Sequence, residues 1–102
     1  MKLMTKELRE QLPPLGATDG DPDPIIRAKY FDPGGAWTWL VIEFDGKDTF
    51  FGAVSGVEFE LGYFSLSELE QTTGAFGLHI ERDLYFKPTP LSEIRKQYDR
   101  HG

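Results

Sequence analysis

Hydrophobic and polar positions in the middle of the chain alternate with the period of β-strands and are interrupted at two tight-turn signals. The pattern predicts three antiparallel strands joined by two hairpin turns, in the order residues 37–44, Asp45-Gly46, residues 50–54, Ser55-Gly56 and residues 57–63. The run from Trp37 to Glu70 is therefore expected to form a β-meander that leads into a helix.

The two outer strands of this meander differ in how their apolar side chains are distributed. Residues 37–44 are apolar on both faces, as in a central strand covered on both sides, with Leu40, Ile42 and Phe44 on one face and Trp37, Trp39 and Val41 on the other. In residues 57–63, the side chains expected to face inward are Val57, Phe59, Leu61 and Tyr63. Glu58 and Glu60 are expected to face water.

Helix signals flank the meander. Thr5 is placed to cap a helix from about Lys6 to Leu12. Ser65, with Glu68 three residues later, forms a capping box for a helix that begins at Leu66. The remaining elements are a strand at residues 25–31, one strand or two half-strands within residues 78–86, and a final helix after Thr89-Pro90. The predicted fold class is α+β, a mostly antiparallel meander sheet of four to five strands with two or three short helices packed on it.

The length of 102 residues suits a single domain, residues 1–102, with one core. Residues 13–24 are rich in Gly, Asp and Pro and are expected to form a mobile loop, and the C-terminal tail, DRHG, is expected to fray. The chain contains no cysteine, which excludes disulfides and thiolate chemistry, and no segment is apolar enough to span a membrane. We therefore expect a soluble, cytoplasmic protein that does not bind membranes.

The net charge of -6 is concentrated in the centre of the chain. Residues 19–70 hold eleven acids and three bases. Because binding to a phosphate backbone depends on clustered Lys and Arg, this distribution argues against general affinity for nucleic acid without excluding it. It favours solubility, or a negative surface that meets a basic partner.

Candidate chemistry is sparse. Asp19, Asp21 and Asp23 match the first ligand spacings of a calcium-binding EF-hand loop, but Pro24 replaces the required glycine, so we expect a solvated loop. His79 alternates with apolar neighbours and is expected to be exposed. We predict no metal site, no cofactor and no catalytic residue. The cluster Glu81-Arg82-Asp83 is either a structural ion pair or an anchor for an anionic ligand.

Aromatic side chains are the strongest functional signal, because they exceed what one face of a small sheet can cover. Exposed rings beside acids commonly mark a partner surface, although a packed second face or a homodimer would also explain them. The candidate binding surface consists of Trp37, Trp39, Val41, Glu43, Phe51, Glu58, Glu60 and Arg82.

Three stretches, WTWLVIEFDGKDTFFGAVSG, ELGYFSLSELE and ERDLYFKPTPLSEI, resemble the domain of unknown function family numbered 2958. The resemblance covers most of the chain from Ala36 to Ile94 and supplies no established catalytic residues. It implies a small protein of plasmids, phages and integrated elements, some of whose relatives are fused to domains linked with anti-restriction functions.

The first hypothesis is a non-catalytic interaction protein, not an enzyme, that binds a protein partner and inhibits a component of a host defence system of the anti-restriction or anti-CRISPR type. A second hypothesis is single-stranded nucleic-acid binding, with Trp37, Trp39 and Phe51 as stacking platforms and Arg27 and Lys29 near the phosphates. A third is a small enzyme that uses Glu81, Asp83 and His79. Whether the protein is a monomer or a homodimer stays open.

Overall fold

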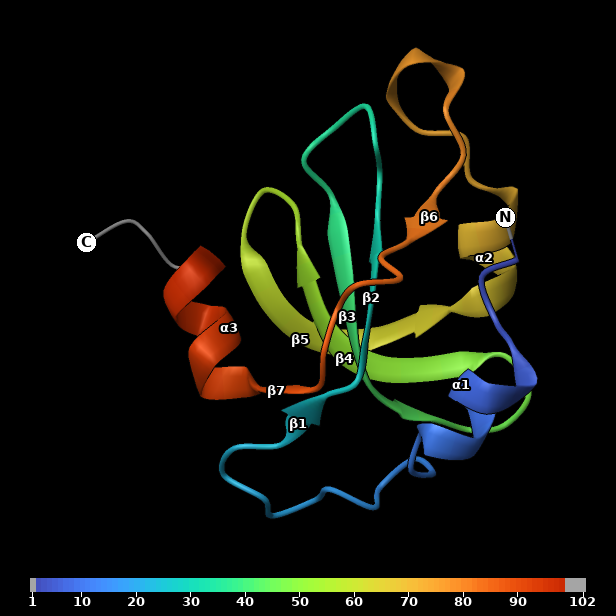
Figure 1. Ribbon diagram of the computed structural model, residues 1–102. Helices are drawn as coiled ribbons and strands as arrows, with labels where there is room; N and C mark the ends of the chain where they lie inside the picture. The colour runs from blue at the N-terminus through green and yellow to red at the C-terminus, as the bar shows by residue number, and fades with distance from the viewer. Residues whose placement is uncertain (1, 99–102) are drawn as a thin grey trace.

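The computed structural model describes residues 2–98, so the tail DRHG, residues 99–102, lies outside the described part and its expected fraying stays a prediction. A five-stranded antiparallel sheet has the strand order β5-β4-β3-β2-β6, with three short helices packed on it (Figure 1). This confirms the predicted α+β class. The elements are α1 (Lys6–Gln11), β1 (Ile25–Ile26), β2 (Ala28–Phe31), β3 (Thr38–Phe44), β4 (Thr49–Ser55), β5 (Phe59–Ser65), α2 (Leu66–Gln71), a 3₁₀ turn (Ala75–Gly77), β6 (Glu81–Arg82), β7 (Thr89–Pro90) and α3 (Leu91–Tyr98).

Both predicted helix caps are present. The Thr5 hydroxyl accepts a hydrogen bond from the Leu8 amide at 3.1 Å, and the Ser65 hydroxyl accepts one from the Glu68 amide at 3.3 Å. Asp48, in the turn between β3 and β4, also accepts the Ser67 amide at 2.8 Å. The hydrogen bonds from the Ser65 side chain and from Ser67 hold the pKa of Asp48 below its ordinary value. The first hairpin turn therefore also fixes the start of α2.

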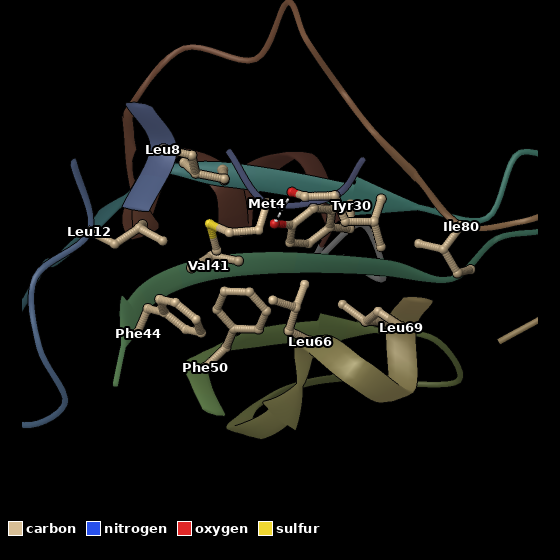
Figure 2. Packing of buried hydrophobic residues seen from close by; sticks show 12 residues of the cluster. Met4, Leu8, Leu12, Tyr30, Val41, Phe44, Phe50, Leu66, Leu69 and Ile80 are labelled. Carbon is tan, nitrogen blue, oxygen red and sulfur yellow. Dashed lines mark hydrogen bonds between the residues drawn. The ribbon is translucent and has the colours of Figure 1, made fainter. Parts of the chain in front are cut away.

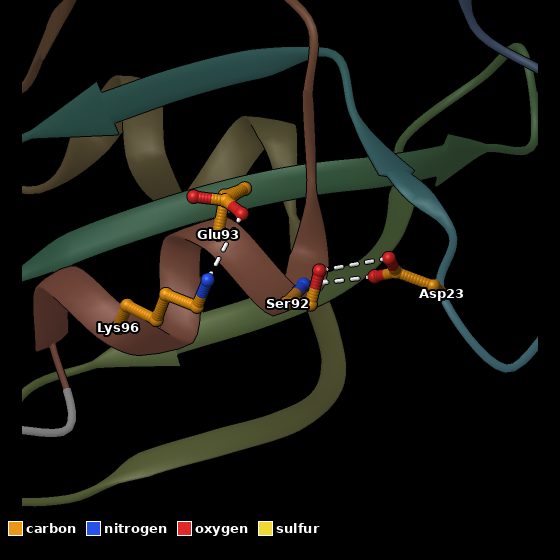
Figure 3. A network of polar contacts seen from close by, with 4 residues as sticks. All are labelled: Asp23, Ser92, Glu93 and Lys96. Atoms are coloured by element: carbon orange, nitrogen blue, oxygen red, sulfur yellow. Dashed lines mark hydrogen bonds and ion pairs between the residues drawn. The ribbon is translucent and has the colours of Figure 1, made fainter.

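The predicted strand at residues 25–31 is divided at Arg27. Its second half, β2, pairs with β3 and β6, whereas β1 leaves the main sheet and forms a two-stranded ladder with β7. At this ladder α3 begins, because Asp23 accepts hydrogen bonds from the Ser92 amide and hydroxyl, both at 2.8 Å (Figure 3). Asp23 thus caps a helix 69 residues later in the chain, a role that its own neighbourhood does not suggest.

The sheet separates two hydrophobic clusters. The first cluster is covered by the N-terminal segment, α1 and α2, and the buried Tyr30 donates a hydrogen bond from its hydroxyl to the Leu3 carbonyl at 2.6 Å (Figure 2). Burial raises the pKa of that hydroxyl. The second cluster is covered by α3 and by Phe86 of the segment that crosses from β6 to β7 (Figure 1). Both faces are therefore used to form the core.

A β-bulge in β3 corrects one predicted face. Cross-strand pairs run regularly to Val41↔Gly52 and then shift, so that Glu43 pairs with Phe51 and Phe44 pairs with Phe50. The extra residue sends Phe44 into the first cluster with Val41, not to the side of Leu40 and Ile42 as predicted. Opposite the bulge only glycine fits, because a Cβ on Gly52 would lie 1.9 Å from the Leu40 carbonyl oxygen.

The inward stripe predicted for residues 57–63 is wrong in most of its members. The strand runs over Phe59–Ser65, so Val57 lies in the preceding turn and is 92% exposed. Leu61 is 44% exposed and Tyr63 is 70% exposed, whereas Phe59 is half-buried against Tyr98. The reason is that β5 is an edge strand, and the ring contacts of α3 with it lie at Phe59, where Tyr98 and Arg95 pack.

Candidate functional site

Four of the eight residues of the candidate surface gather at one end of the β3, β4 and β5 strands. Trp39 is opposite Val54, and Val54 is opposite Glu60, so these three side chains share a face of the sheet. Trp37 and Glu58 lie in the adjoining turns. We call the hollow lined by Trp37, Val54, Val57, Glu58 and Glu60 the Trp37 hollow, and its volume is about 180 Å³.

The two indoles are held in a fixed arrangement beside this hollow. Their ring centroids lie 6.2 Å apart, with ring planes 26° apart. Trp37 is 46% exposed, and its ring rests on Gly56, where an added Cβ would lie 2.4 Å from the ring. Trp39 packs against the first hydrophobic cluster. A rigid aromatic surface therefore stands beside two exposed carboxylates, and no base is among the residues that line the hollow.

Val41 and Glu43 do not belong to this surface, because both are buried. Val41 lies in the first cluster, under the N-terminal segment. Glu43 is only 2% exposed and lies on the opposite face because of the bulge. The sequence prediction placed both on the exposed face, and it was wrong because neither the covering segment nor the bulge is visible in a strand pattern.

Glu43 instead holds the loop that precedes β1. Its carboxylate accepts the Gly16 and Thr18 amides, each at 2.8 Å, and the Thr18 hydroxyl. Burial alone would raise the pKa of Glu43, but the hydrogen bonds from Thr18 and Gly16 outweigh it and bring the pKa below its ordinary value. Residues 13–24 are thus tied to β3 at two points, while the predicted mobility of the loop tip stays a prediction.

Phe51 and Arg82 lie away from the Trp37 hollow. Phe51 is on the other face, where its ring contacts Tyr63 with centroids 5.2 Å apart. Arg82 is on β6, at the opposite edge of the sheet, and donates a hydrogen bond to the Thr5 hydroxyl at 3.5 Å. The eight predicted residues therefore divide into four that come together and four that do not.

Residues 3–102 match the sequence profile of a family described as Protein of unknown function (DUF2958). The chain belongs to this family. No curated protein and no solved structure matches the chain. The family resemblance drawn from the three sequence stretches is thereby confirmed for nearly the whole length of the chain.

In this DUF2958 protein the three residues of the enzyme hypothesis line two different hollows. Glu81 and Asp83 line one hollow together with Lys29, whose Nζ lies 3.9 Å from the Asp83 carboxylate. His79 is exposed, as predicted, and lines another hollow with Glu70. Within residues 2–98, no group of three His, Asp or Glu side chains is arranged to hold a metal ion.

Two residues of the Trp37 hollow were missed from the sequence, Val54 and Val57. The signal for the exposure of Val57 was its position directly after Ser55-Gly56, since connecting segments run over the protein surface. Among the described helices of this DUF2958 protein, none is long and apolar enough to cross a membrane.

Proposed function

We propose that the protein is a non-catalytic interaction module that binds a basic segment of a protein partner in the Trp37 hollow. The observation that carries this proposal is the pairing of an exposed, rigid indole with two exposed carboxylates, Glu58 and Glu60, in one hollow. A Lys or Arg side chain can lie against an indole while its charge meets a carboxylate. A volume of about 180 Å³ admits a side chain but is small for a metabolite.

In the setting that the family resemblance implies, the partner belongs to a host defence system, and binding inhibits it. The hollow lies at the end of three strands and is fixed by the Gly56 contact, so the partner meets a preformed surface. Exposed aromatic residues of this kind commonly supply most of the energy of a protein interface.

Single-stranded nucleic acid is the second candidate, because the exposed Trp37 ring is also what base stacking requires. Two features weigh against it. Phe51 lies on the other face of the sheet from Trp39, and Glu58 and Glu60 would repel a phosphate backbone at the hollow.

Tryptophan fluorescence tests the proposal directly, because Trp37 and Trp39 are the only tryptophans in the chain. An arginine-rich peptide is expected to change the emission in a saturable manner, and the same peptide with glutamine in place of arginine is not. Glu60→Gln should weaken binding several-fold. The matched control is Glu10→Gln, which removes the same charge from the exposed face of α1.

Equal weakening by both variants would mean that only net charge attracts the peptide, and it would contradict a site in the Trp37 hollow. A gel-shift assay at low salt with single-stranded oligonucleotides distinguishes the second candidate: tight, salt-sensitive binding that Trp37→Ala abolishes would replace our proposal. Affinity purification from the native host, with wild-type protein, Trp37→Ala and Glu10→Gln side by side, then identifies the partner.

A further inference from the structure

Strand β5 leaves one long edge of the sheet open. It pairs with β4 over seven consecutive residues without a register shift. On its other side no strand follows in the sheet order, and within residues 2–98 no backbone hydrogen bond reaches that side. Exposed strand edges are templates for pairing with another chain.

The hydrogen bonds of the turns show which groups face outward. In the β4–β5 turn the Gly56 amide donates to the Glu58 carbonyl at 3.1 Å. Because hydrogen-bonded and non-hydrogen-bonded pairs alternate along an antiparallel ladder, Glu60, Gly62 and Phe64 bond to β4. The backbone groups of Phe59, Leu61 and Tyr63 therefore point outward.

The preceding hairpin gives the same assignment. In the turn between β3 and β4 the Asp45 amide donates to the Thr49 carbonyl at 2.9 Å. The next pair along this ladder, Phe44↔Phe50, therefore has no hydrogen bond between β3 and β4. The backbone groups of Phe50 must then bond to Phe64, its partner on β5, which agrees with the assignment made from the β4–β5 turn.

The outward edge ends at Ser65. Ser65 is the N-cap of α2, and an N-cap carbonyl accepts the first bond of its helix. The open edge thus consists of Phe59, Leu61 and Tyr63, and Leu61 is its centre.

This edge lacks the features that usually prevent strand pairing. Natural edge strands are protected by Lys, Pro, bulges or short length. Strand β5 has none of these, and its only charged residue is Glu60. Two of its outward residues, Leu61 and Tyr63, expose apolar side chains on one face.

We infer that β5 pairs antiparallel with β5 of a second copy of this chain, with Leu61 on the twofold axis. In this register the backbone groups of all three outward-pointing residues form pairs. Leu61 lies opposite Leu61, and Phe59 of each copy lies opposite Tyr63 of the other. It also places Glu60 opposite Gly62, so no carboxylate meets another. A shift of the axis to Glu60 would bring two carboxylates face to face, which destabilises strand pairs.

The paired sheets form one continuous ten-stranded sheet, and the two Trp37 hollows lie on the same face of it. Leu61 and Tyr63 lie on the opposite face, because they pair with Ala53 and Phe51. The exposed apolar side chains of the edge and the Trp37 hollow therefore lie on different faces, and Glu60 is the residue of β5 that lines the hollow.

Single cysteines test this register, because the chain has no cysteine of its own. Opposite residues of a hydrogen-bonded pair have Cα atoms about 5.5 Å apart, a distance that a disulfide spans. Under mild oxidation Leu61→Cys should form a covalent dimer that reductant dissolves. Glu60→Cys, whose opposite residue is glycine, and Tyr85→Cys, which is 92% exposed elsewhere, should form no covalent dimer under the same conditions.

Charge variants test the same axis without a covalent link. By analytical ultracentrifugation the wild type should dimerise with rising concentration, and Leu61→Glu and Leu61→Lys should each be monomeric. A mixture of the two variants should restore the dimer, because opposite charges then meet on the axis. Circular dichroism of each variant excludes loss of the fold as the reason.

The inference is overturned if the wild type stays monomeric at every concentration, or if Leu61→Cys crosslinks no faster than Tyr85→Cys. It is also overturned if the two charge variants do not associate when mixed. Should a different protein be crosslinked to Leu61→Cys while the chain itself stays monomeric, the edge accepts a foreign strand and not a second copy.

Discussion

The two edges of the five-stranded sheet differ in length and in what covers them. The β6 edge is two residues long, follows the buried Ile80, and has the Lys29–Asp83 ion pair beside it. The β5 edge is seven residues long, and two of its outward residues expose apolar side chains. A short, anchored edge cannot accept another strand, whereas a long and unprotected one can.

This difference also explains an error of the sequence prediction. The alternation in residues 57–63 is what an inward-facing strand would show, yet the same alternation occurs in a strand whose apolar face projects beyond the covering helix. An apolar stripe therefore shows which side chains share a face. It does not show whether this chain or another one covers them.

The largest loss of stability is expected for a substitution at the anchored β6 edge. Ile80→Ala removes buried side-chain volume from the first cluster and should lower the free energy of unfolding by about 2–5 kcal/mol. Tyr63→Ala, on the open edge, should change it by no more than about 0.5 kcal/mol, because that side chain is largely exposed. Urea denaturation of dilute protein measures both values. Equal losses would mean that the two edges are equally packed.

The second largest loss of stability is expected at the Glu43 carboxylate. This group holds the loop of residues 13–24 against the face of the sheet that carries Leu61 and Phe51. Glu43→Gln turns an amide group toward the donors of Gly16 and Thr18, and it should cost about 1–3 kcal/mol in the free energy of unfolding. Glu10→Gln on the surface is the control. A neutral result for Glu43→Gln would show that the loop is not held by this side chain.

The same carboxylate gives a pH dependence of known sign. The pKa of Glu43 is lower in the folded protein than in the unfolded chain, so its contribution is complete above the unfolded pKa, about 4.3. The contribution is lost as pH falls through the folded pKa. The difference in stability between wild type and Glu43→Gln should therefore shrink on acidification below about pH 4, in urea titrations at successive pH values.

Much of the fold follows from local patterns. The features that local patterns did not predict arise from contacts between distant parts of the chain. The caps at Thr5 and Ser65 and the turn at Asp45-Gly46 act within a few residues, so a short stretch of sequence predicts them, and Asp48 reinforces the start of α2 from the first hairpin turn. The separation of β1 from β2 and the capping of α3 by Asp23 join segments far apart in the chain. No local pattern encodes these two features.

The candidate site was half predictable for the same reason. Trp39 and Glu60 lie on strands that neighbour β4 on its two sides, so a correct meander brings them to one face. Glu43 was misplaced because a bulge changes the alternation by one residue, and Arg82 because β6 joins the far edge of the sheet. Strand order and bulges, unlike hairpins, are set by packing of the whole domain.

Hydrogen exchange should show a smaller effect along β5 itself. In dilute protein the amides of Glu60, Gly62 and Phe64 should exchange more slowly than those of Leu61 and Tyr63, because only the first set bonds to β4. A bonded amide exchanges only after local opening, and breaking one hydrogen bond costs about 1 kcal/mol or more, so the rates should differ by at least about fivefold. Exchange measured by NMR resolves each amide. Uniform protection along the strand in the monomer would contradict the assigned direction of the edge.

The smallest effect is expected at the Lys29–Asp83 ion pair beside β6. Both side chains are partly exposed and their charged atoms lie 3.9 Å apart, so Lys29→Met should lower the free energy of unfolding by about 0.2–1 kcal/mol. Methionine keeps the apolar stem, so the change removes the charge but little packing. The difference should decrease in high salt, because screening weakens the pair in the wild type. A loss as large as that of Ile80→Ala would show that the β6 edge is held by its charges, and the contrast between a packed edge and an open edge would then fail.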